Sequence, residues 1–527
     1  MKYNYVDMVL LKGKILTMDA CDSVVEAVAV DKGVIVGTGN SDEIIKMAGS
    51  HTEVIDLKGK TMIPGFIDAH THIDLYGTMT SEHAVSCHVP PLKSTDDILE
   101  KIKKAASEKP EGAMIICQGR VDQQYPTKEQ LDRVAPEHPV LIKAAMHNYI
   151  LNSCALNEFG INKDRPSFEE LYDIVPGAVV VRDPVTGEPT GWLEESWDYL
   201  FPRSQSPFSY RETYAGIKKG LDDLSRYGVT SIAEFLCYPE SPRIYQELYR
   251  NDELNVRVQL IPCFHGINRT VELDEVINAG FTSGFGDEWV KFGGLKMFVD
   301  LQQDTTCTSV QLNEWFKKAH RAGIRMLMHA ITRKGQEMAL AAIEREADSS
   351  GLEGIKKMRH RIEHMGNEGH DLDFLRRVKE LNAIAVPTAY FLSLRPFKLM
   401  SAPTEKKYMF RTMLDMGLCV PGNSDCAGSI PECLNPMYEI WCMVNRKSFD
   451  GEIFIPSEKI SVLEALRVYT IHAAYADHEE KVKGSVEVGK LADFAVFSED
   501  PLTVDEDHLK ELQIAMTIVN GQVVYQQ

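Results

Sequence analysis

The sequence contains no Cys-x-x-Cys pair, and its 11 cysteines form an odd set scattered from Cys21 to Cys442. A scattered, odd set is unlike the disulfide framework of a small secreted domain, and it fits a reducing compartment. Cys419, Cys426 and Cys433 fall at intervals of seven residues, without the close pairing of a typical cysteine metal site. We interpret the cysteines as small buried residues rather than as metal ligands.

The sequence also lacks any apolar run near the roughly 20 residues that a membrane-spanning helix needs. The N-terminal stretch carries Asp7 inside its apolar part and lacks the layout of a signal peptide, so we expect a cytoplasmic location. Positive charge is scarce, because 57 Lys and Arg face 77 Asp and Glu, a formal net charge of −20. This balance disfavours nucleic acid and anionic membranes as partners.

Length and composition permit a large buried core. At 527 residues the chain exceeds one ordinary domain and suits a large barrel with a small appended domain. Hydrophobic residues make up 44% of the chain and charged residues 25%, as in ordinary folded proteins. There are no internal repeats.

The chain is organised around residues 61–77, where a short apolar run leads into Asp68, His70 and His72. Residues two apart in a strand point to the same side, so these three side chains share a face. An apolar strand that delivers two imidazoles from its C-terminal end is suited to a divalent metal. We predict a barrel strand over 62–67 with a metal site at its end.

The middle of the chain alternates short β-like runs with amphipathic helical stretches, as a (β/α)8 barrel requires. The other predicted strands span 229–234, 256–261, 290–299, 324–328, 360–363, 383–386 and 418–422. His329 and His364 end the fifth and sixth strands, and Asp425 follows the eighth. With His70 and His72, these residues would meet at the mouth of the barrel. Four imidazoles and one carboxylate suit zinc, or manganese, iron or cobalt.

Residues 78–215 separate the first two strands, which is too long for an ordinary loop. We expect an insertion with its own strands over the active-site face, and its aromatic residues, including Trp192, suggest an apolar or aromatic substrate group. Both chain ends are predicted to form short strands, one of them over 9–18 and a hairpin at Asn520-Gly521. We predict a β-sandwich from residues 1–60 and 481–527, and a barrel over 61–480.

The segment 61–77 resembles the first barrel strand of the amidohydrolase superfamily, in particular its YtcJ-like branch, which includes N-substituted formamide deformylases. The segment 484–493, Gly-Ser-Val-Glu-Val-Gly-Lys-Leu-Ala-Asp, resembles the C-terminal signature of the superfamily. The resemblance covers nearly the whole chain. It implies an α/β fold, a TIM-like barrel with a β-sandwich from both ends, and a metal-dependent hydrolase acting on carbon–nitrogen bonds other than peptide bonds.

Lys296 lies on the predicted fourth strand. A protonated lysine cannot bind a metal, but a desolvated one can lose its proton and react with CO₂ to give an anionic carbamate. The resemblance implies that Lys296 bridges two metal ions in this form. The alternative is an ion pair of Lys296 with Asp300 or another carboxylate. Glu234, at the end of the second strand, and Glu194 are rival carboxylates near the site.

The resemblance also implies roles for the insertion. His147, in a His-x-x-x-x-Asn segment, is a candidate for orienting the substrate. Glu194, in a segment similar to one that family members carry, is placed near the pocket beside Trp192. Arg361 is expected to brace the barrel rather than to touch the substrate.

The implied reaction is hydrolysis of a linear amide, such as an N-acyl or N-formyl compound, by a metal-activated hydroxide. Asp425 would take the proton of the nucleophile and pass it to the departing nitrogen. Two alternatives stay open. One is a mononuclear deaminase or cyclic amidohydrolase of the same superfamily, which would not need Lys296, and the other is a non-catalytic scaffold. A homo-oligomer is expected by analogy alone.

Overall fold

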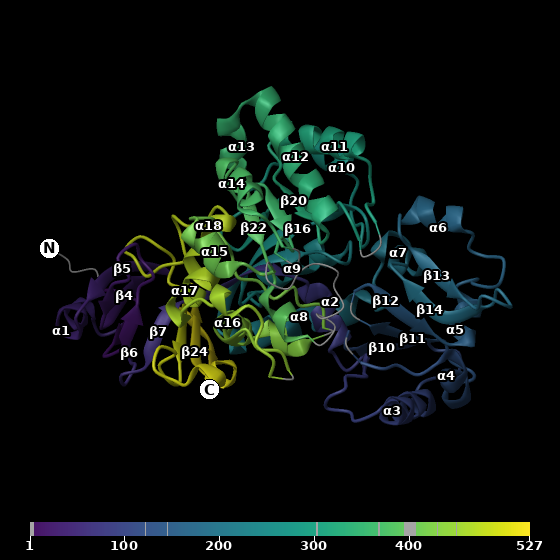
Figure 1. Cartoon of the computed structure of the whole chain (residues 1–527). Helices are drawn as coiled ribbons and strands as arrows, with labels where there is room; N and C mark the ends of the chain where they lie inside the picture. Colours follow the sequence, from purple (N-terminus) through teal and green to yellow (C-terminus); the bar gives the residue numbers. More distant parts are fainter. Residues whose placement is uncertain are drawn as a thin grey trace.

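The computed structural model describes residues 5–121, 123–144, 146–301, 304–366, 369–394, 407–428, 430–449 and 451–527. A β-rich unit made from both chain ends lies at one side, the helix-covered barrel strands lie in the middle, and the insertion sheet lies at the other side (Figure 1). None of the helices in these ranges combines the length and the apolar character that crossing a membrane requires.

The terminal unit has two sheets that pack against each other. The first has the order β5-β4-β1-β6 and consists of β1 (Met8–Leu11), β4 (Ala27–Asp31), β5 (Val34–Gly39) and β6 (Glu53–Asp56), with the short helix α1 (Ser41–Ile44) beside it. The second has the order β25-β24-β23-β7-β2-β3 and consists of β2 (Lys14–Leu16), β3 (Val24–Val25), β7 (Thr61–Pro64), β23 (Phe494–Phe497), β24 (Ile514–Val519) and β25 (Gln522–Gln526). Leu10, Val28, Phe494 and Ile518 share one buried cluster between the sheets, so both chain ends contribute to this core.

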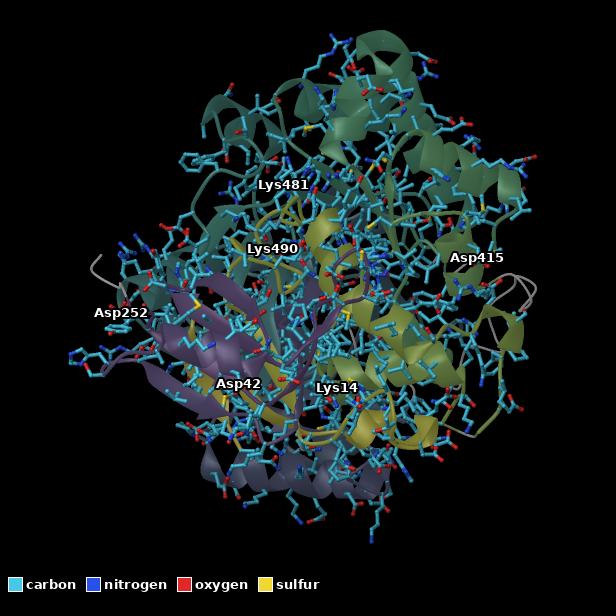
Figure 2. The ribbon with its side chains drawn as sticks, turned by 90° about the vertical axis from the view of Figure 1, so that its left-hand side faces the viewer. Lys14, Asp42, Asp252, Asp415, Lys481 and Lys490 are labelled. Atoms are coloured by element: carbon cyan, nitrogen blue, oxygen red, sulfur yellow. The ribbon has the colours of Figure 1, made fainter. Side chains whose placement is uncertain are left out.

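One expectation for this unit is wrong. The single strand expected over 9–18 is split into β1 and β2, which belong to different sheets. The chain turns at Lys12, whose φ of 55° is left-handed, and at Gly13, where a Cβ would lie 2.5 Å from the Leu57 side chain. Figure 2 views the molecule from this side, where Lys14 forms an ion pair with Asp500 at 2.5 Å.

The barrel strands form two sheets, and the strands within each sheet are parallel. One has the order β18-β16-β15-β8 and consists of β8 (Phe66–Thr71), β15 (Val229–Phe235), β16 (Arg257–Ile261) and β18 (Val290–Phe292). The other has the order β17-β19-β20-β21-β22 and consists of β17 (Cys263–His265), β19 (Leu295–Phe298), β20 (Met326–His329), β21 (Arg361–Glu363) and β22 (Ile384–Val386). The first barrel strand is therefore β8 rather than 62–67, because the chain before Gly65 pairs with the terminal unit as β7.

Two other strands differ from expectation. The fourth breaks into β18 and β19 at Gly293-Gly294, where Gly294 has a φ of 152° and a Cβ would lie 2.5 Å from the carbonyl oxygen of Arg325. The eighth has no regular ladder among the described residues, but the extended chain there still lies beside β8. Its Gly422 accepts a backbone hydrogen bond from Ala69, and the N–H of Asp425 donates to His70 at 2.8 Å.

Helices cover the strands, and every residue of one of them, α16 (Pro436–Asn445), is buried. They are α8 (Tyr210–Arg226), α9 (Ser241–Arg250), α10 (Leu273–Asn278), α11 (Ser309–Arg321), α12 (Arg333–Ser350), α13 (Leu352–Met358), α14 (Leu372–Glu380), α15 (Phe410–Asp415), α16 (Pro436–Asn445), α17 (Val462–Arg467) and α18 (Ala473–Ala476). Several start with a capping box, in which a Ser or Thr side chain and a Glu or Gln three residues later satisfy the first free N–H groups, as at Ser209 and Thr308. Apolar residues of these helices join the strands in one large buried cluster.

The insertion forms its own six-stranded sheet, as expected, in the order β13-β14-β12-β11-β10-β9. Its strands are β9 (Val85–Ser86), β10 (Ile115–Gly119), β11 (Val140–Ala144), β12 (Asn148–Leu151), β13 (Val179–Arg182) and β14 (Pro189–Glu194), and its helices are α3 (Thr95–Glu108), α4 (Lys128–Val134), α5 (Ser153–Glu158), α6 (Phe168–Ile174) and α7 (Trp197–Leu200). One face of the sheet packs on α3 and α4. On the other, Tyr149 and Leu193 share a buried cluster with Cys237, Phe298 and Ala427 of the barrel, so the insertion covers the strand ends.

Candidate metal centre

Strand β8 delivers the two histidines at its C-terminal end. His70 Nδ1 lies 2.6 Å from Glu363 Oε2, and His72 Nδ1 lies 2.6 Å from the carbonyl oxygen of Phe235. A carboxylate and a carbonyl oxygen only accept hydrogen bonds, so each Nδ1 carries a proton, and the neutral form of each ring keeps its lone pair on Nε2. The two Nε2 atoms lie 3.6 and 3.4 Å from Asp425 Oδ1. Both rings are therefore fixed with their free nitrogens toward one carboxylate.

His364 and Asp425 reach the same place through unusual backbone turns. His364 follows β21 with a φ of 65°, and Asp425 has a φ of 44°, both in the left-handed region that non-glycine residues rarely adopt. His364 Nδ1 lies 3.8 Å from Asp425 Oδ2. Ligand atoms of His70, His364 and Asp425 all lie within 4.8 Å of one another, close enough to share one metal ion. Backbone strain of this kind concentrates at functional sites.

His329 completes the cluster from the end of β20, with its ring centre 4.5 Å from that of His364. The Nε2 atoms of His70 and His329 are buried, and neither has a hydrogen-bond partner in the described part of the chain. A buried imidazole nitrogen without a partner is costly unless something else satisfies it. The donor set of four imidazoles and a carboxylate therefore fits a divalent cation.

Burial sets the protonation of the cluster. It lowers the pKa of His70 and of His329 well below the usual range and the pKa of His364 to about 3, so these imidazoles are neutral with lone pairs available. Burial alone would raise the pKa of Asp425, but His364 and His72 outweigh it, and the pKa lies below its ordinary value. Neutral imidazoles around an ionised carboxylate are the forms that bind a metal.

Lys296, on β19, is buried beside the cluster. Its Nζ lies 4.7 Å from the ring centre of Phe235 and 5.0 Å from that of Phe298, and burial lowers its pKa. It forms no ion pair with any residue of the described ranges. The alternative ion pair with Asp300 is not formed among the described residues. The Asp300 carboxylate instead accepts hydrogen bonds from the backbone N–H groups of Ile331 and Thr332, both at 2.8 Å.

The carboxylates near the cluster have separate structural uses. Glu234 accepts from the N–H groups of Ile73 and Asp74, both at 2.8 Å, and thereby caps helix α2 (Ile73–Met79). Glu363, which the sequence did not single out, holds His70 and is itself held by Arg361 at 2.7 and 3.0 Å. The local signal for Glu363 was its position two residues after Arg361 on one strand, which places both side chains on the same face.

From the insertion, His147 reaches the cluster. Its ring centre lies 6.5 Å from that of His329, and its Nδ1 lies 2.8 Å from Oε2 of Glu195, a residue that the sequence did not single out. Burial lowers the pKa of His147, but Glu195 and then Asp425 outweigh it, and the pKa lies above its ordinary value.

The structure does not bring Trp192 to the cluster. Trp192 packs on the α3 and α4 side of the insertion sheet, 6.5 Å from the ring of Tyr125, whereas the next residue, Leu193, belongs to the cluster on the barrel side. Glu194 pairs with Asn148 across β12 and β14, and alternation along the strand puts its side chain on the face of Trp192.

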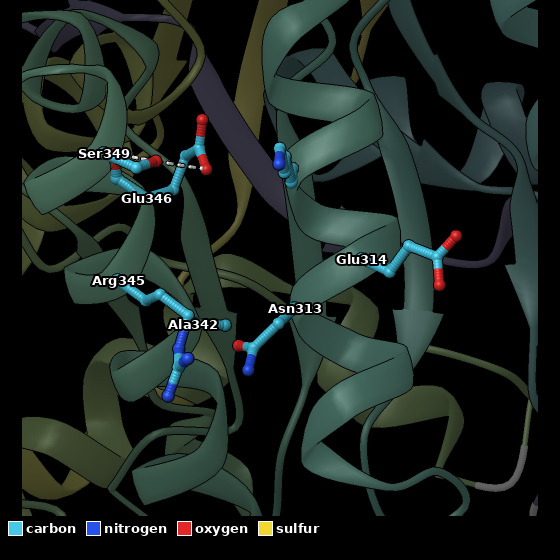
Figure 3. A pocket seen from close by; sticks show the side chains of 7 residues that line it. Asn313, Glu314, Ala342, Arg345, Glu346 and Ser349 are labelled. Carbon is cyan, nitrogen blue, oxygen red and sulfur yellow. Dashed lines mark hydrogen bonds between the residues drawn. The ribbon is translucent and has the colours of Figure 1, made fainter.

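A surface groove of about 300 Å³ lies elsewhere, between α11 and α12 (Figure 3). Its lining includes Lys317, Arg345 and Ser349, and none of the clustered histidines. Glu346 there is satisfied by Ser349 Oγ at 2.8 Å and Arg321 at 2.9 Å. The groove therefore has ordinary surface chemistry and is separate from the candidate metal centre.

A family model described as "Amidohydrolase family" matches residues 53–525, most of the chain. The chain belongs to the amidohydrolase family. Membership of this family identifies it as an enzyme, a metal-dependent hydrolase that acts on carbon–nitrogen bonds.

Two curated relatives match almost end to end. The putative amidohydrolase YtcJ of Bacillus subtilis (strain 168) is 29% identical, and the match covers 95% of this chain and 96% of that protein. The N-substituted formamide deformylase of Arthrobacter pascens is 26% identical over 99% of this chain and 98% of that protein. The predicted branch of the superfamily is thereby confirmed.

Solved structures share the fold. A metal-dependent hydrolase from Pyrococcus horikoshii OT3 has a TM-score of 0.73 at 21% identity, covering 95% of this chain and 99% of that one. A second, from Pyrococcus furiosus, has a TM-score of 0.71 at 22% identity, covering 94% and 100%. These similarities confirm the TIM-like metal-dependent hydrolase fold with a β-rich terminal unit.

Proposed function

We propose that the enzyme hydrolyses linear amides, of the N-acyl or N-formyl class, at a centre that binds one or two divalent metal ions. The carrying observation is the convergence of four imidazoles and Asp425, with the buried Nε2 atoms of His70 and His329 lacking any partner in the described ranges. The ligands would be His70, His72, Lys296, His329, His364 and Asp425, with zinc as the first candidate because it prefers imidazole and carboxylate ligands. The relative from Arthrobacter pascens is an N-substituted formamide deformylase, which supports the N-formyl class.

Lys296 would contribute as a carbamate. Its amine would attack CO₂ to form an N–C bond, and one proton would leave to solvent, giving an anionic group where the lysine now has no carboxylate partner among the described residues. Burial, which lowers the pKa of Lys296, favours the neutral amine that this reaction needs.

A divalent cation at such a site acidifies a bound water and polarises the carbonyl oxygen of an amide. The residues of the chain supply the rest. Asp425, ionised and within 3.4 Å of His72, would accept the proton of the attacking water and donate it to the departing nitrogen, which leaves as an amine. Glu363 and the carbonyl of Phe235 would keep the rings of the first-strand histidines from rotating.

The first test is metal content per chain, measured by mass spectrometry on protein produced with added zinc. We expect two metal ions in the wild type and one or none in Lys296→Met, which keeps an unbranched apolar side chain in the buried site. Lys143→Met is the matched control, since Lys143 is equally buried but lies in the insertion sheet. Release of amine from N-formyl and N-acyl amines by the zinc-loaded protein then tests the reaction.

One observation favours a second candidate, a mononuclear deaminase or cyclic amidohydrolase. Among the described residues, the ligand atoms of His70, His364 and Asp425 lie within 4.8 Å of one another, and three such ligands are enough for one metal ion. A single metal ion that is unaffected by Lys296→Met, with turnover of cyclic amides or aminated heterocycles, would establish this candidate. If folded protein that was supplied with zinc holds no metal, the non-catalytic scaffold is the remaining candidate. A cytoplasmic location and a homo-oligomer also remain proposals, to be tested by fractionation and by light scattering.

A further inference from the structure

The chain around Asp425 is held by few contacts of the barrel itself. Asp425 has a left-handed φ of 44°, and the chain before it forms no regular ladder among the described residues. Its N–H donates to the carbonyl oxygen of His70 at 2.8 Å, and the N–H of His72 donates to the carbonyl oxygen of Cys426 at 3.2 Å. A strained conformation persists only where the surrounding structure holds it from several sides. The chain that follows Asp425 therefore needs an anchor as well.

His88 of the insertion provides that anchor. Its side chain is buried just beyond β9, and its Nε2 lies 2.7 Å from the carbonyl oxygen of Gly428, three residues after Asp425. The chain turns at Gly428, whose φ of 85° suits a glycine. A carbonyl oxygen only accepts, so Nε2 of His88 carries a proton in either protonation form of the ring. This is the one hydrogen bond that the backbone of residues 427–428 makes to the described residues.

The insertion fixes the His88 ring independently of the loop. Ser86 Oγ lies 2.9 Å from Nδ1, the ring nitrogen that does not bind the loop. Gln123 fixes the backbone on both sides of the ring, since it accepts from the N–H of Val89 at 3.0 Å and donates to the carbonyl oxygen of Cys87 at 2.8 Å. Because the ring is already ordered, its hydrogen bond to the loop costs little further conformational entropy.

A second link joins the insertion to the same part of the chain. Arg120, directly after β10, donates from Nη1 to both carboxylate oxygens of Glu432, at 3.0 and 3.1 Å. The Arg120 side chain is 4% exposed, whereas that of Glu432 is 48% exposed. The N–H of Arg120 also donates to Oε1 of Gln123 at 3.0 Å, so one glutamine braces both links. The insertion therefore contacts the chain after Asp425 at two points.

We propose that His88 is a positioning residue, which holds the loop 425–428 through Gly428 and thereby keeps the Asp425 carboxylate facing the metal-binding histidines. This inference rests on the proposed function, in which Asp425 is both a ligand and the proton carrier. It gives the insertion a second role besides covering the strand ends. His88 acts only through the backbone of the loop, and a small displacement of that backbone would move the carboxylate away from its productive position.

The test compares His88→Gln with His88→Asn. The amide nitrogen of glutamine reaches the position of Nε2 and keeps the donor, whereas that of asparagine reaches only the position of Nδ1 and loses it. Both variants lack the ring, so the difference between them reports the hydrogen bond to Gly428. His138→Gln is the matched control, because His138 is a buried histidine of the insertion whose Nδ1 donates to the carbonyl oxygen of Ala113, at 2.9 Å, within the insertion itself.

Two measurements are made on each protein. The visible absorption spectrum of the cobalt-loaded protein reports the arrangement of the metal ligands, and kcat and KM for an N-formyl amine are measured on the zinc-loaded protein. His88→Asn should shift the cobalt spectrum and lower kcat by about 10-fold with little change in KM, as the loss of a group that orients a metal ligand does. His88→Gln and His138→Gln should keep the wild-type spectrum and most of the wild-type kcat.

Equal spectra and equal kcat values in His88→Gln and His88→Asn would overturn the inference, as would a lowered kcat in His88→Asn with the wild-type spectrum. If the zinc-loaded wild type hydrolyses no amide, the proposed function fails, but the cobalt spectra still decide whether His88 positions Asp425. Urea unfolding of each variant checks folding. Ser86→Ala, which removes the partner of Nδ1, replaces His88→Asn if that variant does not fold. It should shift the cobalt spectrum in the same direction, and an unchanged spectrum there would overturn the inference.

Discussion

Two histidine–glutamate pairs lie at the candidate metal centre, one from the barrel and one from the insertion. In both, a carboxylate accepts from Nδ1, at 2.6 Å in His70–Glu363 and at 2.8 Å in His147–Glu195. The barrel pair is sealed, with side chains 1% and 0% exposed, and Arg361 neutralises Glu363 through two hydrogen bonds. The insertion pair is open on the histidine side, and Glu195 forms no ion pair with an arginine of the described residues.

The difference is electrostatic. Glu363 already shares its charge with Arg361, and burial keeps His70 neutral, since its pKa lies well below the usual range. Glu195 forms its ion pair with His147, and the pKa of His147 is raised. The same two side chains therefore produce a neutral ring that can bind a metal in the barrel and a ring with a raised pKa in the insertion. The complete burial of His70 is the first cause of this difference, and the positive charges of Lys296 and Arg361 add to it.

The largest expected effect comes from replacing Asp425, whose carboxylate lies near both pairs. Asp425→Asn should lower kcat for amide hydrolysis by about 1,000-fold or more, because an amide cannot accept a proton and binds metal weakly. Initial rates at saturating substrate measure this. Asp415→Asn, a largely exposed residue of helix α15, is the control and should keep wild-type activity. If the Asp425→Asn variant kept most of its activity, Asp425 would take no part in the reaction and would have a structural role.

Next in size is the effect on metal affinity. Glu363→Gln should weaken zinc binding by about 10- to 100-fold, because it loosens the orientation of a metal-binding histidine. Glu195→Gln should leave zinc affinity unchanged, because its partner is no ligand. Competition with a chromogenic chelator measures both. Equal losses in the two variants would contradict the assignment of different roles to the two pairs.

On the barrel side of this comparison, the sequence predicts where the histidines lie but does not single out Glu363. His70, His72, His329 and His364 lie at strand ends, and strand ends are marked by local apolar runs that can be recognised without tertiary information. The parallel topology then brings these ends together. The same signal, the apolar run 418–422, predicts the position of Asp425. This run forms no regular ladder among the described residues, but the N–H of Asp425 still donates a hydrogen bond to the carbonyl oxygen of His70.

The insertion side is less predictable for a physical reason. Alternation along β14 separates Trp192 from Leu193, but which face meets the barrel depends on how the whole sheet docks. Glu195 lies two residues after Leu193, so alternation favours the barrel face for it once the docking of the sheet is known, although its φ of 52° lies just beyond the end of β14. The resemblance to the superfamily points to its neighbour Glu194 instead.

The smallest expected effect is on how the free energy of unfolding depends on pH. Because Glu195 raises the pKa of His147 above 6.5, the pair stabilises the fold fully below that pH and loses this contribution as pH rises through the raised pKa. The destabilisation caused by Glu195→Gln, measured by urea unfolding, should therefore be largest in mildly acidic solution and shrink in alkaline solution. Glu363→Gln should show no such decrease over the same range, because His70, with its lowered pKa, stays neutral throughout. If both variants followed the same pH course, the two pairs would be electrostatically alike, and neither the burial of His70 nor the charge on Arg361 would distinguish them.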